Sequence, residues 1–318
     1  MLASPYFMRK NTRMMHDPFS HILKLADAES VISGELSAGG QWSVRFPPPS
    51  QIKFFGVTKG QCWLIPEGAP TALRLQEGDI FLLAAPRPFI LASAPSLPPV
   101  EALSLFRRED KSGIIGDGGD LVLLCGHVEL DRHNASLLTE VLPPLFHISA
   151  QDENAADLHW VLRRLLRERM EEQPGAELAA IQLGQLLLLQ ILRLHLETAR
   201  HIPEGWLRLL RDPRLAAVLE AMQRDPARNW RLEDLAKLAG MSRTSFTELF
   251  KAAAGVPPLG FLTDWRMRLA KRALSRDNPP LAELSEALGY ASESAFSNAF
   301  KRVVGISPRH FREGRARI

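Results

Sequence analysis

Two sets of polar side chains, separated by fifty residues, have types and spacings suited to hydrogen bonding with nucleic acid bases. The first set is Arg243, Thr244, Thr247 and Glu248, and the second is Glu293, Ser294, Ser297 and Asn298. Helical periodicity predicts that each set lies on the exposed face of one short helix. Guanidinium, hydroxyl, amide and carboxylate groups on such a helix can recognise base edges in the major groove.

Cationic side chains accompany both sets. The candidates for phosphate contact are Lys251, Arg266, Lys301, Arg302 and again Arg243. Such contacts fix the register of a protein on a duplex without carrying sequence information. Residues 206–318 have 20 Lys and Arg against 12 Asp and Glu, whereas residues 1–205 have 19 against 24. This distribution is typical of a nucleic-acid-binding module joined to a sensing or assembly module, although a solvated basic face without a partner is the alternative.

Both sets belong to a repeated unit. Between residues 233–261 and 283–311, an offset of fifty gives nine identities: Glu233/Glu283, Leu238/Leu288, Ser242/Ser292, Phe246/Phe296, Phe250/Phe300, Lys251/Lys301, Gly255/Gly305, Pro258/Pro308 and Phe261/Phe311. Each unit predicts a short helix, a tight turn, a serine N-cap, and a second helix with two phenylalanines on one buried face. A glycine then ends the helix. Two such units predict paired helix-turn-helix motifs, at about 232–254 and 281–304.

A connecting helix is predicted between the two units, over the segment "FLTDWRMRLAKRALSRDNPP". Its apolar residues have helical spacing, and cations lie around them. Two helices that enter the major groove from one face of a duplex must lie about 34 Å apart. A stiff spacer would hold them at a constant separation.

Two regions of the chain resemble the domains of a known protein family. The region from about 213 to 318 resembles the DNA-binding domain of AraC-type (AraC/XylS) transcription factors, through "WRMRLAKRAL", "LGYASESAFSNAFKRVVGISPRHFR" and the paired units. The front half, from "GQWSVRF" to "LLCGHVELD", resembles the cupin-type sensor domain that precedes it in one branch of that family. Together the two matches cover nearly the whole chain.

The resemblance also implies which positions face the groove. They are Thr244, Thr247, Glu248, Ser294 and Asn298. Family members often have arginine at the positions of Glu248 and Asn298. Asparagine can bond adenine through two atoms, whereas a carboxylate can only accept from cytosine or repel phosphate. We therefore expect the second unit to recognise adenine-containing sequence and the first to contribute less; alternatively, Glu248 points to solvent and pairs with Arg243 or Lys251.

The fold class expected is α+β with several domains. Residues 1–135 predict a cupin-like β-barrel, because short apolar segments alternate with Pro- and Gly-rich turns. Residues 136–203 predict a helical hairpin, which packs on the barrel or forms a dimer interface, and residues 204–212 predict a linker. Residues 213–318 form the expected all-α domain, in which a long helix joins the two helix-turn-helix units.

The sensor residues are less well defined by the sequence. Cupin metal sites use histidines from two strand motifs, and "KFFGVTKGQCWL" and "GDIFLLAAPRPFIL" contain none, so we expect no metal. Arg45 and Trp63, with Trp42 and Phe54, are candidates for an effector pocket, or else for core and rim. Cys62 and Cys125 are candidates for oxidant sensing, and Cys125 with His127 for a metal or redox site. Buried thiols and a rim histidine are the simpler interpretation.

Three functions fit these observations. The first is a sequence-specific DNA-binding transcription regulator that responds to a small molecule or oxidant. The second is a cupin enzyme with an accessory helical domain, which the missing histidines and the lack of a Ser/His/Asp set or phosphate-binding glycine loop disfavour. The third is an adaptor that has lost DNA binding, suggested only by Glu248. Salt-dependent binding to promoter DNA would separate the third from the first.

The expected partners are promoter DNA and a second copy of the chain in a homodimer, with RNA polymerase as a further candidate. No cofactor and no catalytic residue are expected. Two cysteines are too few for a disulfide scaffold, the first residues lack a signal-peptide core, and "LGQLLLLQILRLHLE" is interrupted by polar residues. We therefore expect a bacterial protein of the cytoplasm without a membrane span.

Overall fold

The computed structural model describes residues 17–68, 71–105, 112–171 and 173–314. The prediction about a signal peptide concerns residues 1–16 and lies largely outside this part. Contacts divide the chain into two units. One is Leu25–Arg211, and the other is Asp212–Ile318 together with the described N-terminal residues up to Lys24.

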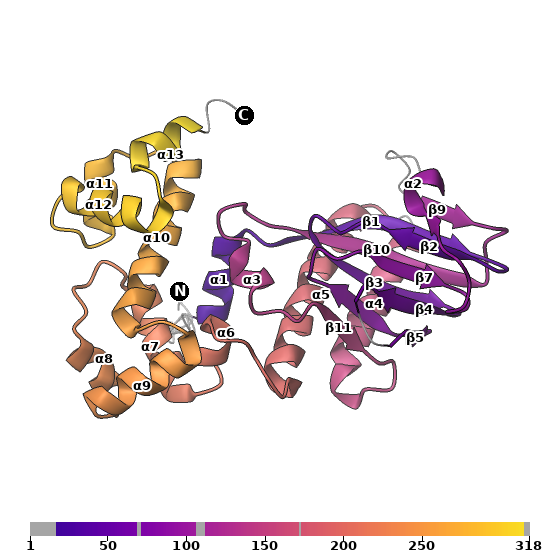
Figure 1. Cartoon of the computed structure of the whole chain (residues 1–318), viewed down its shortest axis with the longest axis horizontal. Helices are drawn as coiled ribbons and strands as arrows, with labels where there is room; N and C mark the ends of the chain where they lie inside the picture. Colours follow the sequence, from indigo (N-terminus) through magenta and orange to yellow (C-terminus); the bar gives the residue numbers. More distant parts are fainter. Residues whose placement is uncertain (1–16, 69–70, 106–111, 172, 315–318) are drawn as a thin grey trace, which may run out of the picture. The chain divides into compact units, whose positions relative to one another are not determined.

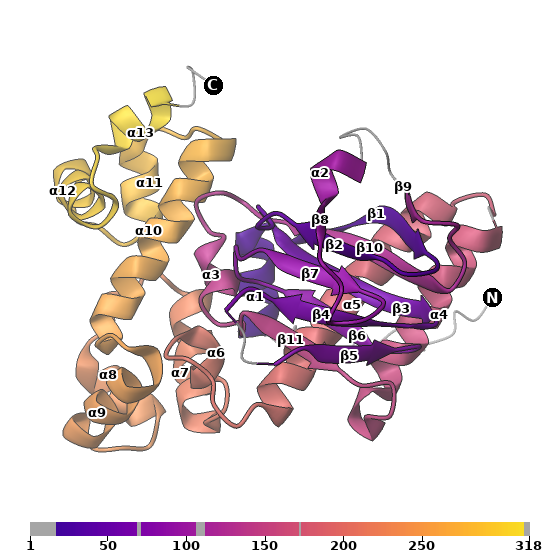
Figure 2. The same cartoon turned by 45° about the vertical axis from the view of Figure 1, so that its right-hand side comes forward.

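The unit Leu25–Arg211 is built on two sheets that enclose one core (Figures 1 and 2). The first has the strand order β11-β6-β3-β10-β1-β9, and the second β5-β4-β7-β2-β8. The bounds are β1 Glu29–Ala38, β2 Ser43–Phe46, β3 Ile52–Lys59, β4 Gln61–Pro66, β5 Leu73–Gln76, β6 Ile80–Leu83, β7 Phe89–Ala92, β8 Val100–Glu101, β9 Ser112–Ile115, β10 Leu121–Glu129 and β11 Leu145–Ile148. Alternate residues such as Leu64, Phe81 and Leu123 fill the core. The predicted β-rich front domain is confirmed.

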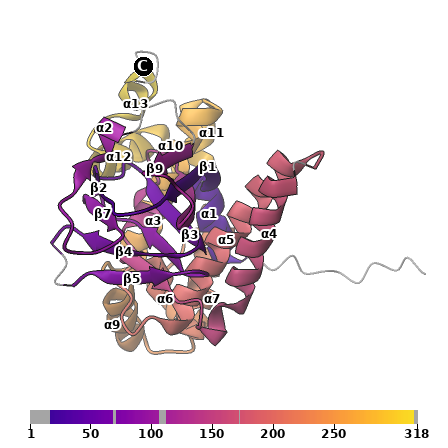
Figure 3. The same ribbon diagram turned by 90° about the vertical axis from the view of Figure 1, so that its right-hand side faces the viewer.

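Two long helices pack on the first sheet, side by side in Figure 3. They are α4 (Ala156–Glu171) and α5 (Ala176–Thr198). A Cβ atom added to Gly56 of β3 would lie 2.6 Å from the Leu162 side chain of α4, so α4 packs closely on this strand. By length and composition α5 could cross a membrane, but Leu187, Leu188 and Ile191 are buried, as in a core helix. Of the two alternatives for the hairpin, packing on the barrel is therefore observed.

The structure differs in two places from the predicted helical hairpin at 136–203 and linker at 204–212. Residues Leu145–Ile148 form β11, which pairs antiparallel with β6. Residues Trp206–Leu209 form the short helix α6, in which Trp206 is 4% exposed and its Nε1 donates to the Leu137 carbonyl oxygen at 2.6 Å. The remaining short helices are α1 Pro18–Ala26, α2 Ala102–Leu105, α3 Ser136–Thr139 and a 3₁₀ turn at Glu153–Ala155.

The C-terminal unit is helical, as predicted. Its helices are α7 Pro213–Arg224, α8 Leu232–Leu238, α9 Arg243–Ala254, α10 Pro258–Arg276, α11 Leu281–Ala287, α12 Glu293–Val304 and α13 Pro308–Gly314. In Figure 1, α10 runs between the pair α8–α9 and the pair α11–α12. Its 19 residues correspond to a length of about 28 Å. The structure therefore contains two helix-turn-helix units joined by one long helix.

Candidate nucleic-acid interface

The first unit presents one face of α9 to solvent. The Ser242 hydroxyl accepts from the Ser245 amide at 3.2 Å, as an N-cap, and Gly255 ends the helix with φ 78°. Phe246 and Phe250 are fully buried, with ring centroids 5.7 Å apart. Because these rings fix one face in the core, the predicted residues lie at the surface: Arg243, Thr244, Glu248 and Lys251 are exposed, and Thr247 is half-buried.

The second unit repeats this construction in α12. Ser292 accepts from the Ala295 amide at 3.1 Å, and Phe296 and Phe300 are fully buried. The residues predicted as DNA contacts lie away from this core: Ser294, Asn298, Lys301 and Arg302 are exposed, and Glu293 and Ser297 are half-buried. The surface of each helix therefore brings hydroxyl or amide groups together with cations.

Charges are arranged differently in the two units. Arg243 of α9 pairs with Glu233 of α8 at 2.9 Å, whereas Glu293 of α12 lies 3.7 Å from Arg309 of α13. Within the described residues, Glu248 forms no ion pair, so the alternative in which it pairs with Arg243 or Lys251 is not observed. Its carboxylate is consequently available to accept from a base or to repel phosphate. The Thr247 hydroxyl donates to the Arg243 carbonyl at 2.8 Å and is partly committed to the backbone.

Arg266 is not placed as a phosphate contact, so this prediction needs correction. Its Nε donates to the Pro226 carbonyl at 2.7 Å and its Nη2 to the Arg228 carbonyl at 3.0 Å. Burial also lowers the pKa of this guanidinium, which lies beside Tyr290. The side chain therefore holds a loop of the protein. The other predicted phosphate contacts, Lys251, Lys301 and Arg302, are exposed.

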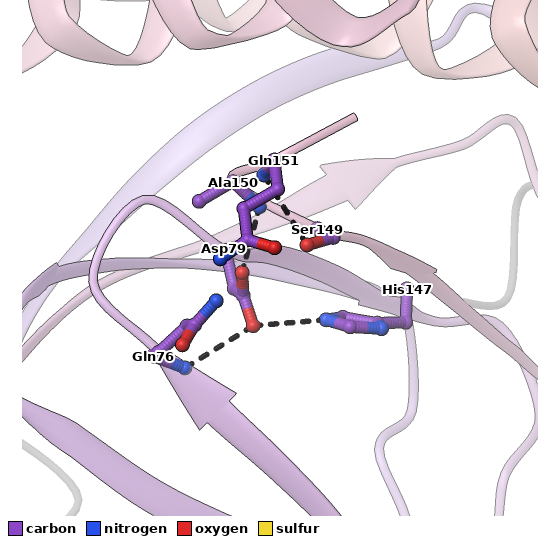
Figure 4. A network of polar contacts seen from close by, with 6 residues as sticks. All are labelled: Gln76, Asp79, His147, Ser149, Ala150 and Gln151. Carbon is purple, nitrogen blue, oxygen red and sulfur yellow. Dashed lines mark hydrogen bonds and ion pairs between the residues drawn. The ribbon is translucent and has the colours of Figure 1, made fainter. Parts of the chain in front are cut away.

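At one end of the barrel, Asp79 organises a polar network (Figure 4). Asp79 is 2% exposed, and its carboxylate accepts from the Gln76 amide at 3.1 Å, from Nε2 of His147 at 3.0 Å and from the Ala150 amide at 2.8 Å. These bonds join the turn between β5 and β6 to the chain that follows β11. Sequence reasoning missed this network, because its partners come from segments about seventy residues apart.

A cavity of about 750 Å³ opens beside this network. It is lined by Gly40, Trp42, Gly60, Gln61, Gln76, Glu77, Ser93, Asp120, Leu121, Ala150 and Gln151. Its charged lining residues, Glu77 and Asp120, are both acidic. The arrangement suits a polar molecule that is neutral or cationic better than an anion.

The pocket predicted from Trp42, Arg45, Phe54 and Trp63 does not exist as one site. Trp42 belongs to the interior core, whereas Arg45 and Trp63 alternate with the interior residues Val44 and Leu64 and lie on the outer face of the second sheet. Arg45 is also paired with Glu67 at 2.8 Å. Phe54 packs against Gly126 of the first sheet.

Nor do the remaining sensor candidates form a reactive site. Cys62 and Cys125 are free thiols of the barrel core, and burial raises the pKa of each to about 12. His127 follows Cys125 on the same face of β10, but its Nδ1 lies 2.7 Å from the Ser33 hydroxyl. Within the described residues, no three His, Cys, Asp or Glu side chains are grouped to hold a metal ion.

We expect neither native cysteine to react quickly with a thiol reagent at pH 8 in the folded protein, because a thiol with so high a pKa is almost never deprotonated. Both should react after unfolding in guanidinium. Ser294→Cys, at an exposed position, serves as the positive control. The measurement is colorimetric thiol titration over time. Rapid modification of Cys62 or Cys125 in the folded protein would restore the oxidant-sensing hypothesis.

A barrel domain followed by paired helix-turn-helix units, each with an exposed polar recognition helix, defines a DNA-binding transcription regulator. Residues 17–197 match a family described as cupin, and residues 235–314 match a helix-turn-helix domain family. An AraC-like transcription regulator of Streptomyces lividans is 40% identical over 298 residues, which cover 93% of this chain and 98% of the relative. One of Streptomyces antibioticus is 38% identical with the same coverage. The chain belongs to the AraC family of transcription regulators.

Among solved structures, the DNA-binding domain of AdpA in complex with a target DNA is similar at 32% identity. The match covers 33% of this chain and 96% of that one, with a TM-score of 0.32. The family assignment, which rests on the sequence matches, supports a DNA-binding regulator over the alternative of a cupin enzyme.

Proposed function

We propose that α9 and α12 contact successive major grooves of promoter DNA, and that α12 supplies most of the sequence recognition. The observation that supports this proposal is the repeated geometry: two N-capped helices with buried phenylalanine pairs present polar faces from the two units that α10 joins. The length of α10, about 28 Å, is comparable to the 34 Å between successive grooves.

Asn298 is the residue with the most specific chemistry on either helix. It is exposed on α12. Its Nδ2 can donate to N7 of adenine while its Oδ1 accepts from the N6 amino group, which gives a bidentate contact. On α9 the corresponding residue is Glu248. Its carboxylate is negatively charged, as phosphate is, so the two groups repel each other. Lys251, Lys301 and Arg302 are proposed to bind phosphates and set the register.

The first experiment is selection of binding sites from a random duplex library by the full-length protein, followed by affinity measurements at several salt concentrations. Asn298→Ala is expected to lose about 1–3 kcal/mol of discrimination at one adenine position, roughly fivefold to 150-fold in relative affinity. It should leave the slope of log affinity against log salt unchanged, because no phosphate contact is removed.

Gln182→Ala provides a matched control, since it removes an exposed amide from α5. Equal loss of affinity for all sequences in Asn298→Ala would contradict direct recognition by this residue. Failure to select any duplex, with no salt-dependent binding, would favour the adaptor hypothesis instead.

Response to a small-molecule or oxidant effector, homodimer formation and contact with RNA polymerase stay predictions. The cavity beside Asp79 is the place in the barrel that we propose for an effector, because it combines Trp42 with several amide and hydroxyl side chains.

A further inference from the structure

The loop at residues 225–230, which joins α7 to α8, is ordered by its own contacts. The Arg228 amide donates to Oδ1 of Asp225 at 3.1 Å, and Nε1 of Trp230 donates to the Asp225 carbonyl at 2.9 Å. The guanidinium of Arg228 lies 4.0 Å from the centroid of the Trp230 ring, which is itself 8% exposed. The loop therefore has a fixed shape and presents its carbonyl groups in a constant direction.

Two of these carbonyls are held by the connecting helix. Arg266 of α10 donates from Nε to the Pro226 carbonyl and from Nη2 to the Arg228 carbonyl, at 2.7 and 3.0 Å. The rigid fork of a guanidinium suits this double contact, whereas the single ammonium of lysine does not. The loop and α10 are thus joined near the middle of the helix.

The carbonyl between them contacts the second helix-turn-helix unit. A Cβ atom added to Gly289, in the turn between α11 and α12, would lie 2.0 Å from the Ala227 carbonyl oxygen. The next residue, Tyr290, has its ring centroid 5.6 Å from the guanidinium carbon of Arg266. One loop therefore packs on α10 and on the turn of the second unit at the same time.

A second connection of this kind restricts the motion of the second unit relative to the first. The second unit is already attached to the spacer by an apolar cluster, in which Met267, Ala270 and Leu274 of α10 pack with residues of α11 and α12. The loop adds a further connection, from the segment that precedes the first unit to the turn of the second. Two linked binding modules gain affinity from each other only when their separation matches the spacing of their sites. If the two units can move relative to each other in the free protein, the conformational freedom that they lose on binding DNA lowers the affinity.

We propose that the 225–230 loop, held by Arg266, fixes the second helix-turn-helix unit relative to the first, and that Arg266 is a positioning residue for simultaneous binding of two grooves. This inference rests on the proposed function. The loop, Arg266 and the Gly289 turn together form a clamp, and loss of the clamp should leave each unit folded but allow their separation to vary.

The first test needs no DNA. Spin labels are attached at Thr247→Cys and Ser297→Cys in the full-length protein, and the distance between them is measured by pulsed electron resonance; the parent protein without these changes controls for labelling of Cys62 and Cys125. Arg266→Ala should broaden a narrow distance distribution. Arg272→Ala, a half-buried arginine of the same helix, is the matched control and should not. An unchanged distribution in Arg266→Ala would overturn the clamp.

The second test uses the duplex selected above and a version with the segment bound by α12 scrambled. Arg266→Ala should lower affinity for the intact duplex roughly tenfold or more and leave affinity for the scrambled duplex unchanged. Arg266→Lys distinguishes a positioning residue from a phosphate contact, because lysine could replace arginine in binding phosphate, with the same salt dependence, but cannot bridge two carbonyls. Full rescue by lysine, or equal losses on both duplexes, would contradict the proposal. If no duplex is selected, the proposed function is contradicted, but the distance measurement without DNA still tests the clamp.

Discussion

Phe296→Ala is expected to destabilise the second helix-turn-helix unit by about 3–5 kcal/mol. The ring is fully buried, and its centroid lies 5.6 Å from that of Tyr290 and 5.7 Å from that of Phe300. Its removal leaves a cavity at the centre of the cluster that joins α10, α11 and α12. Since the stability of a single domain is only about 5–15 kcal/mol, this change should leave α11–α13 largely unfolded or strongly fraying.

Hydrogen exchange followed by mass spectrometry measures this effect locally, which is needed because a chain with several domains need not unfold in one step. Amides of α12 should lose protection, while those of the barrel strands should not. Phe296→Leu is the matched control, because it keeps most of the volume and should cost clearly less. Full protection of α12 in Phe296→Ala would show that the phenylalanine cluster does not hold this unit together.

Gly289→Ala is expected to cost about 3 kcal/mol, much more than the same change at Gly240. Both glycines lie in the turn of a helix-turn-helix unit and have positive φ, 76° and 65°. An alanine at either position is therefore strained by about 1 kcal/mol. Only at Gly289 would the new methyl group also collide with the Ala227 carbonyl oxygen. A Cβ atom added at Gly240 would have no atom of a neighbouring segment within 4 Å.

The two variants can be compared by urea unfolding monitored through circular dichroism, with hydrogen exchange to assign the change to α11 and α12. The difference in free energy of unfolding between Gly289→Ala and Gly240→Ala measures the cost of the collision with the Ala227 carbonyl oxygen, because the backbone strain is common to both variants. Equal destabilisation would mean that the loop moves aside at little cost, and the clamp would then be weaker than the geometry indicates.

Local signals allowed the helical unit to be predicted from the sequence. Serine N-caps, paired phenylalanines and terminating glycines recur fifty residues apart, and each acts within a few residues of its own position. Strand β11 was missed because four residues behind two prolines have no pattern of their own, and the strand is defined by pairing with β6. The ordered α6 was missed for a similar reason, since Trp206 is held by the distant Leu137.

The errors among the candidate site residues have the same origin. Arg266 looked like a phosphate contact because its charge is visible in the sequence, whereas its carbonyl partners lie 38 and 40 residues earlier in the chain. Arg45, Trp63 and Phe54 were candidates for one pocket, with core and rim as the alternative, and strand register puts them outside the barrel core. Residue types alone do not determine which face of a strand they occupy.

The contact between Gly289 and Ala227 means that the two helix-turn-helix units are not interchangeable modules. They share a common plan, in which Gly240 and Gly289 occupy the same place: each has positive φ and donates its amide to the carbonyl three residues earlier, of Lys237 or Glu286. Only the turn at Gly289 lies against a carbonyl oxygen, that of Ala227, whereas nothing lies within 4 Å of a Cβ atom added at Gly240. Any history of duplication has therefore been followed by specialisation, in which the second copy became fitted to a surface that the first copy does not touch.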